Sequence, residues 1–238
     1  LVGGRANPNT LPKLPDESVR KVAEELVRSM DKVGTDVQFL SPRPYLQMHS
    51  VKPGRVTELW SVHCNDLIAR FVQMFPDRFR GVAGLPQYMD EPLELRAIPE
   101  LRRCVEQLGF VGCLINPDPT EGLGDPPGLG DPFWHPLYQA MTELDVPGLI
   151  HSAGSCSARE SYTLKFINEE SIAVVSLLGA KTFDTFPDLK IVVAHGGGAI
   201  PYQMGRLRAW CVRKGEKQSF VEQLKKLYFD TCNYSTEA

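Results

Sequence analysis

Two histidines, His151 and His195, each come directly after an apolar stretch typical of a buried strand, VPGLI at 146–150 and IVVA at 191–194. In α/β proteins ligands bind at the carboxyl ends of parallel strands, so both imidazoles are expected at the ligand-binding rim. Neutral imidazole is the commonest metal ligand and also a base near pH 7. The pair is therefore predicted to bind a metal or to transfer a proton. The alternative for either histidine alone is a structural role with backbone hydrogen bonds.

Three glycines, Gly196 to Gly198, follow His195 at once, and a helix is predicted from Pro201 to about residue 213. Glycines at a strand end let the backbone approach a ligand closely and can expose amide N–H groups to an anion. HGGG also serves as the oxyanion loop of lipases and esterases, but the G-x-S-x-G nucleophile motif that this chemistry needs does not occur. The G-x-G-x-x-G and P-loop patterns of nucleotide-binding proteins do not occur either.

Three polar residues outside the histidine pair are placed to hold a substrate. Arg43 lies in the rigid segment SPRP after a short predicted strand, and Arg206 lies about three turns into the helix after His195. Because guanidinium groups bind carboxylates with two hydrogen bonds, two arginines suit a dicarboxylic substrate. A surface position is the alternative for each. Asn116 begins the segment NPDP after another strand, where a turn residue is the more common explanation.

The other histidines are weaker candidates. His63 lies within a predicted helix and His135 at the start of one, positions that surface or packing residues usually occupy. His49 follows the loop that contains Arg43 and is not selected.

Length and composition are those of an ordinary soluble globular protein, with 238 residues, 42% of them hydrophobic, and a net charge of -3. This charge balance offers no basic stripe for nucleic acid, and no apolar run approaches the roughly 20 residues that cross a membrane. The six cysteines are scattered without a C-x-x-C pair, which predicts reduced thiols in a cytoplasmic protein. Because the sequence begins with Leu1 rather than Met, a preceding signal segment stays an open alternative.

Helices and strands alternate along the chain. The predicted helices cover residues 19–33, 58–75, 92–108, 134–144, 169–178 and 201–213. The predicted strands cover residues 36–40, 80–85, 110–115, 146–150, 190–194 and 227–230. This alternation favours parallel βαβ units, and both an open doubly wound sheet and a (β/α)8 barrel fit it. Because six strands are two fewer than a barrel needs, the first strand, the last strand or both are expected to lie outside the sequence.

Several segments, among them SPRPYLQMHS, FPDRFRGVAGLPQ, GFVGCLINPDP and LYFDTCNY, together resemble the amidohydrolase superfamily. The resemblance extends from about Asp16 onward. It is to the branch that holds aminocarboxymuconate semialdehyde decarboxylase and 4-oxalomesaconate hydratase, and is greatest to the hydratase type. The most specific piece is HGGGxxPYxxGR, which matches from His195 through Tyr202 to Arg206.

This resemblance implies a (β/α)8 TIM barrel, of which strands 2 to 7 are represented, as a single domain over residues 1–238 that is incomplete at both ends. It implies one divalent metal ion, zinc or alternatively manganese, with His151 as a metal ligand. By the same resemblance, His195 polarises a metal-bound water or transfers a proton. Arg43, Arg206, Asn116 and Tyr202 are assigned to substrate binding. The expected partners are a small carboxylate substrate and further copies of the chain, in a homodimer or larger assembly, without nucleic acid or membrane.

The sequence also departs from the family pattern. The H-x-H pair after the first strand and the acidic residue after the eighth have no counterpart, so the remaining metal ligands are expected outside this chain. The expected reaction is addition of water to an unsaturated oxo-dicarboxylate from aromatic ring cleavage. The alternatives are non-oxidative decarboxylation, metal-dependent hydrolysis of an amide or lactone, and a non-catalytic or truncated barrel.

Overall fold

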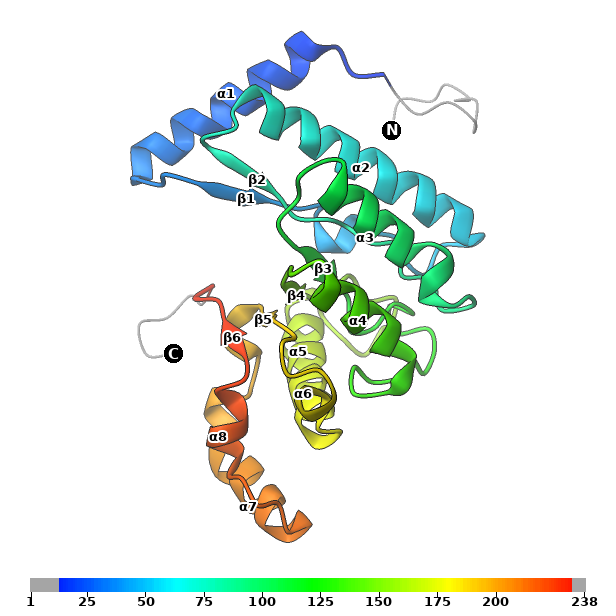
Figure 1. Cartoon of the computed structure of the whole chain (residues 1–238), viewed down its shortest axis with the longest axis vertical. Coiled ribbons are helices and arrows are strands. Elements are labelled where there is room, and N and C mark those ends of the chain that lie inside the picture. The colour runs from blue at the N-terminus through cyan, green and yellow to red at the C-terminus, as the bar shows by residue number, and fades with distance from the viewer. Residues whose placement is uncertain (1–12, 233–238) are drawn as a thin grey trace.

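The computed structural model describes residues 13–232. Its parallel strands alternate with helices along the chain (Figure 1). The strands are β1 Gln38–Leu40, β2 Phe79–Gly81, β3 Cys113–Ile115, β4 Gly148–Ile150, β5 Ile191–Val193 and β6 Tyr228–Phe229. The helices are α1 Asp16–Val33, α2 Gly54–Met74, α3 Ala97–Glu106, α4 His135–Glu143, α5 Tyr162–Gly179, α6 Thr182–Thr185, α7 Met204–Lys214 and α8 Phe220–Leu224. Single 3₁₀ turns lie at Pro44–Leu46, Leu93–Leu95, Pro132–Trp134, His195–Gly197 and Pro201–Gln203.

Strand order follows chain order. β1 pairs with β2, and β3, β4, β5 and β6 form a four-stranded sheet in that sequence, with every pairing parallel. A bridge between Ala83 and Cys113 joins the two sheets, and Leu114 donates its amide to Ala83 at 2.8 Å. Such an order has no point at which it reverses, whereas a doubly wound sheet requires one. The predicted parallel α/β class is confirmed, and the open doubly wound alternative is wrong.

All six predicted strands are present, but each is shorter than its apolar run. The run at 146–150, for example, contributes only β4, and the run at 80–85 overlaps β2 in two residues. The run continues past the paired residues because the neighbouring positions are buried by packing as well as by the sheet. Sequence patterns therefore located the strands but overestimated their lengths.

Helix α1 shows how local sequence sets an element's ends. Acidic Asp16 and Glu17 lie in its first turn, Lys32 lies in its last turn, and both placements complement the helix dipole. Gly34 ends the helix in the left-handed conformation, at φ 74°, which glycine adopts readily at the end of a helix. The apolar face of α1 buries Ala23 and Met30 in a small cluster with Phe79 of β2.

Helix α2 begins at Gly54 and α3 at Ala97, against predicted starts at 58 and 92, and larger differences lie at α5 and in two short helices. Helix α5 begins at Tyr162, seven residues before the predicted start at 169, and Ser161 caps it by accepting a hydrogen bond from the amide of Leu164. The early turns were missed because charged Lys165 interrupts the apolar period there. The short helices α6 and α8 were not predicted at all, since four or five residues are too few to show a period.

The hydrophobic core lies between the four-stranded sheet and the helices around it. Large side chains are fully enclosed here, each contributing on the order of 1.5–3 kcal/mol, and they include Trp134, Leu137, Tyr138, Ile115, Ile150, Leu177, Ile191 and Val193. Among the described residues, no helix is both long and apolar enough to span a membrane. The core fixes the strand ends, and the loops that follow them carry the polar residues considered next.

Candidate functional site

His151 and His195 lie together at the carboxyl ends of two neighbouring strands, β4 and β5, which pair in parallel. The centroids of their rings are 4.8 Å apart, and the ring planes meet at 71°. Two residues 44 positions apart in the chain thus lie side by side at the carboxyl edge of the sheet, as their positions after adjacent strands predict. This edge around His151 and His195 is called the mouth below. The chemical role of each histidine stays a prediction.

His151 is held as the neutral imidazole. Its Nδ1 lies 2.8 Å from the carbonyl oxygen of Ser152, so Nδ1–H donates and the lone pair is left on Nε2. Burial lowers the pKa of His151, with a further lowering from nearby His195. A neutral ring whose Nε2 carries a free lone pair has the form in which histidine binds a metal.

His195 is held by a buried carboxylate and an aromatic ring. Its Nδ1 donates to Glu170, with both carboxylate oxygens at 2.9 Å, and Phe166 stacks on the imidazole at 5.3 Å with planes 6° apart. The bond to Glu170 raises the pKa of His195 against the effect of burial. The orientation leaves Nε2 of His195 for a ligand, and 22% of the side chain is exposed.

Glu170 was not among the predicted site residues. Its side chain is fully buried in α5, and burial raises its pKa although the bond from His195 opposes this. The sequence did carry a signal, because Glu170 recurs at helical spacing with buried Phe166, Ala173, Val174 and Leu177. A carboxylate on the apolar face of a helix needs a partner, and here that partner is His195.

The glycine turn after β5 does not offer its amides to a ligand, which corrects the expectation for Gly196 to Gly198. The amide of Gly196 donates to Asp230 at 2.9 Å, and those of Gly197 and Gly198 donate to Ala194 and His195 within the turn. His195 itself has φ 51°, and the three glycines also have positive φ.

Glycine is required in this turn by close packing against protein. A Cβ at Gly197 would lie 2.7 Å from the ring of Phe229, and one at Gly198 would lie 2.4 Å from the carbonyl oxygen of Ile167. The triplet thus seats the turn between β6 and α5, and in doing so fixes the backbone from which His195 projects.

Asp230, directly after β6, is a second residue that sequence reasoning missed. Its Oδ1 accepts hydrogen bonds from the amides of Gly196 and Cys232, at 2.9 and 3.2 Å. Its negative charge acts to raise the pKa of both His151 and His195. The signal was the one that selected His151 and His195, a polar residue at the end of an apolar strand.

The residues predicted to bind substrate are spread over the structure. Arg43 is exposed in the loop after β1, where its Nη1 lies 2.5 Å from the hydroxyl of Tyr45. Arg206 and Tyr202 are exposed on α7 and the turn before it, and the side chain of neither makes a hydrogen bond or ion pair within residues 13–232. The described contacts do not join Arg206 or Tyr202 to the histidine pair, and the substrate roles of all three residues stay predictions.

Asn116 is completely buried and is bonded to other loops. Its side-chain amide donates to Nδ1 of His49 at 2.9 Å, and its carbonyl oxygen accepts from the amide of Ala153 at 3.4 Å. Nε2–H of His49 donates to the carbonyl oxygen of Leu85, so both ring nitrogens are used, and burial lowers the pKa of His49 to about 4. These contacts give both residues a structural role in joining loops, and the substrate role of Asn116 stays a prediction.

The described residues do not make a metal site by themselves. No group of three or more His, Cys, Asp or Glu side chains within residues 13–232 is arranged to share an ion. A catalytic metal takes about three protein ligands, and the mouth supplies His151 with its free Nε2. A metal at this site would need ligands beyond the described residues.

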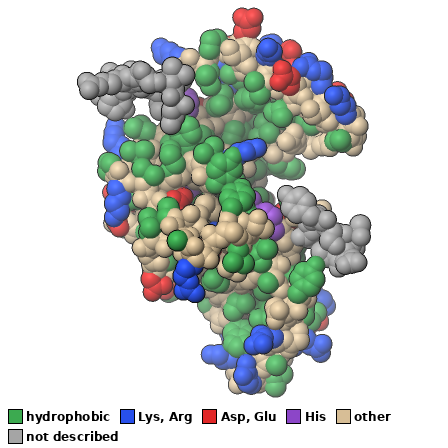
Figure 2. Space-filling model, turned by 180° about the vertical axis from the view of Figure 1, so that it is seen from behind, with side chains coloured by type: hydrophobic (Ala, Val, Ile, Leu, Met, Phe, Trp, Pro, Cys, Tyr) green, Lys and Arg blue, Asp and Glu red, His purple; other side chains and the backbone are tan. Residues whose placement is uncertain are grey.

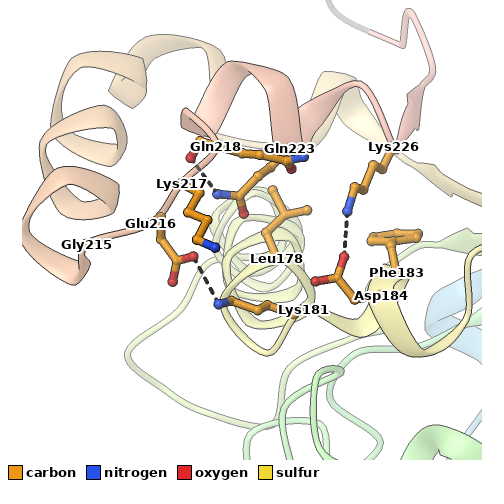
Figure 3. A pocket seen from close by; sticks show the side chains of 10 residues that line it. All are labelled: Leu178, Lys181, Phe183, Asp184, Gly215, Glu216, Lys217, Gln218, Gln223 and Lys226. Carbon is orange, nitrogen blue, oxygen red and sulfur yellow. Dashed lines mark hydrogen bonds and ion pairs between the residues drawn. The ribbon is translucent and has the colours of Figure 1, made fainter.

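A separate cavity of about 360 Å³ lies away from the histidines, between the end of α5, α6 and the segment that joins α7 to α8 (Figure 3). Lys181 pairs with Glu216 and Lys226 with Asp184 across its walls.

On the face turned away from the viewer of Figure 1, a histidine side chain reaches the surface where the molecule is hollowed (Figure 2).

Comparison with known proteins places this geometry in context. The model of the amidohydrolase family matches residues 15–237. A 2-keto-4-carboxy-3-hexenedioate hydratase of Sphingobium sp. is 38% identical over 225 residues, which cover 94% of this chain and 66% of the relative.

Solved structures of related enzymes superpose on this chain. The crystal structure of 4-oxalomesaconate hydratase from Rhodopseudomonas palustris superposes with a TM-score of 0.82 at 34% identity, over 94% of this chain and 63% of that one. A dihydroxybenzoic acid decarboxylase from Polaromonas sp., solved with manganese and 2-nitroresorcinol, gives a TM-score of 0.72 at 29% identity, over 91% of this chain and 71% of that one. The chain thus spans slightly less than two thirds of the two hydratases.

Proposed function

The chain belongs to the amidohydrolase family, and on that premise we propose that the whole protein is a lyase that adds water to an unsaturated oxo-dicarboxylate of the 4-oxalomesaconate type. The two hydratases that it resembles support this reaction. The structural observation that carries the proposal is the placement of His195, which is held on Nδ1 by buried Glu170 beside His151.

His195 is proposed to move the proton in this reaction. Glu170 accepts its Nδ1–H, so the nitrogen that meets a ligand is Nε2. The carboxylate stabilises the imidazolium that forms when Nε2 takes a proton, and the stacked ring of Phe166 limits rotation of the imidazole. Water addition to a conjugated double bond needs a proton delivered to carbon, and a fixed, partly exposed imidazole is suited to deliver it.

We further propose that the strands close into a (β/α)8 barrel, in which β1 to β6 are the second to seventh strands of one domain. The sequential, all-parallel strand order supports closure, since each strand neighbours the next in the chain. A divalent metal belongs to the proposal because the related decarboxylase binds manganese, with zinc as the alternative. Residues 13–232 do not complete its site, to which His151 would contribute its Nε2.

Decarboxylation is the second candidate, because the decarboxylase superposes on the same fold. The full-length enzyme should be given an oxalomesaconate-type substrate and, separately, an aminocarboxymuconate-type one, while hydrated product and carbon dioxide are both measured. We expect hydrated product from the first substrate without carbon dioxide. Release of carbon dioxide without any hydrated product would overturn the hydratase proposal in favour of the decarboxylase.

A further inference from the structure

A row of aromatic side chains connects Arg43 with the histidine pair. The rings of Tyr45 and Tyr162 meet edge to face with centroids 6.0 Å apart, and those of Tyr162 and Phe166 do so at 4.5 Å. Phe166 in turn stacks on His195. Tyr45, Tyr162 and Phe166, called the aromatic row below, therefore form a continuous chain of ring contacts that ends at His195.

The aromatic row is assembled from two distant segments. Tyr162 and Phe166 are one helical turn apart at the start of α5, so they lie on the same face of that helix. Tyr45 comes from the loop after β1 and passes over Gly154 in the loop after β4, where a Cβ would lie 3.9 Å from that of Tyr45. Because β1 and β4 are three places apart in the strand order, this contact spans the mouth at the carboxyl ends of the strands.

The two tyrosines of the row are exposed, whereas the phenylalanine next to His195 is buried. Tyr45 is 37% exposed and Tyr162 56% exposed, while Phe166 is 8% exposed. Covering the two exposed tyrosine rings with an apolar ligand is favourable, because it removes apolar surface from water. The two open rings therefore suit a ligand that contacts the tyrosines and extends toward the imidazoles.

Arg43 supplies a charge at the outer end of the row. Its guanidinium carbon lies 5.6 Å from the centroid of the Tyr45 ring, and Nη1 bonds to the hydroxyl of that tyrosine. Within residues 13–232 it pairs with no carboxylate, whereas Arg96 and Arg103 each contact two. A guanidinium oriented by a neutral hydroxyl keeps donors available for a carboxylate that arrives with a ligand.

We infer that the aromatic row determines specificity, by selecting a flat, conjugated dicarboxylate over a saturated one while Arg43 binds a carboxylate at its outer end. This inference rests on the proposed function, because it describes the substrate of the same mouth. It assigns Tyr45 and Tyr162 to the recognition of substrate.

The test compares two six-carbon dicarboxylates, the flat, conjugated trans,trans-hexa-2,4-dienedioate and the saturated, flexible hexanedioate. Their dissociation constants for the full-length enzyme are measured by titration calorimetry. We expect the flat diene to bind about 3- to 10-fold more tightly, on the scale of one aromatic contact. Tyr162→Leu should remove this preference, whereas Arg43→Gln should weaken both probes by a similar factor. Tyr228→Leu, at an exposed tyrosine outside the row, is the matched control and should keep the preference.

The outcomes separate the inference from the proposed function. Equal binding of both probes, no binding of either, or a preference that survives in folded Tyr162→Leu would overturn the inference, even if the wild-type enzyme hydrates its substrate. A preference that is lost in Tyr162→Leu supports the inference, even if no hydration is found and the proposed function fails. Thermal unfolding of each variant shows that it is folded.

Discussion

Helix α5 carries two buried charged contacts five positions apart, at Lys165 and Glu170, and they differ in how completely they are enclosed. Lys165 reaches Asp118 at 2.5 Å and Glu169 at 3.1 Å, with 2% of the lysine side chain and 5% of the Asp118 side chain exposed. Glu170 is equally buried, but its partner His195 is 22% exposed. The Lys165–Asp118 pair is closed to solvent, although Lys165 also lies 3.6 Å from the partly exposed Glu160, and the Glu170–His195 pair opens at the histidine.

The difference indicates different roles for the two contacts. Asp118 also accepts hydrogen bonds from the amides of Thr120 and Gly122, so with Lys165 it fastens the loop after β3 to α5. Each charged side chain in that contact, Lys165, Asp118 and Glu169, has a partner within the protein. At His195, Nδ1 is hydrogen-bonded to Glu170, whereas Nε2 has no partner among the described residues. A group that acts on a ligand has this arrangement. We therefore expect changes at Lys165 to affect stability and changes at Glu170 to affect turnover.

The largest effect is expected at the closed contact. Lys165→Ala leaves Asp118 buried without its cation and should lower the free energy of unfolding by about 3–5 kcal/mol. Denaturant unfolding of the full-length protein measures this. The control is Lys225→Ala, whose exposed pair with Glu222 should contribute about 1 kcal/mol or less. Equal effects for both variants would show that the buried pair does not fasten the loop.

At the open contact, Glu170→Gln keeps the shape of the side chain but removes the charge that stabilises an imidazolium at His195. We expect turnover to fall about 10- to 100-fold, the scale of losses when an outer partner of a functional histidine is changed. Steady-state kinetics of the full-length enzyme measure it. Glu169→Gln, the adjacent residue bonded to Lys165, is the matched control and should retain turnover. If Glu169→Gln lost as much turnover as Glu170→Gln, the contrast between the two contacts would be refuted.

A smaller effect is expected from acid. Burial would raise the pKa of Asp118, but its bonds from Lys165, Thr120 and Gly122 outweigh this and lower it. A carboxyl whose folded pKa lies below the unfolded value of about 3.9 stabilises the protein above that pH and loses its contribution as the pH falls further. The free energy of unfolding, measured between about pH 2 and 5, should therefore fall less steeply with decreasing pH in Asp118→Asn than in the wild type. Identical slopes would contradict a lowered pKa.

Sequence patterns predicted the strand sequence and the rim, because each depends on local order along the chain. They placed six strands and selected His151 and His195 from their positions after apolar runs. They could not supply the partners of these residues. Glu170 contacts His195, and Asp230 accepts the amide of Gly196. These contacts join residues 25 and 34 positions apart, which local sequence patterns do not relate.

The histidines make the same point. His49 and His195 both lie in loops after predicted strands, yet both nitrogens of His49 are bonded to Leu85 and Asn116 within the protein. Only the packed structure distinguishes a histidine with two internal partners from one with a nitrogen left over. Asn116 was placed at the rim by its position, and its burial with His49 could not be read from the segment NPDP.

The central claim, that the two imidazoles share one mouth but have different roles, is tested most directly by measuring metal content and turnover together in the full-length protein. His151→Ala is expected to lose bound metal, whereas His195→Ala is expected to keep it and to lose about 10²- to 10⁴-fold in turnover. Equal loss of metal in both variants, or full turnover in His195→Ala, would contradict this division of roles.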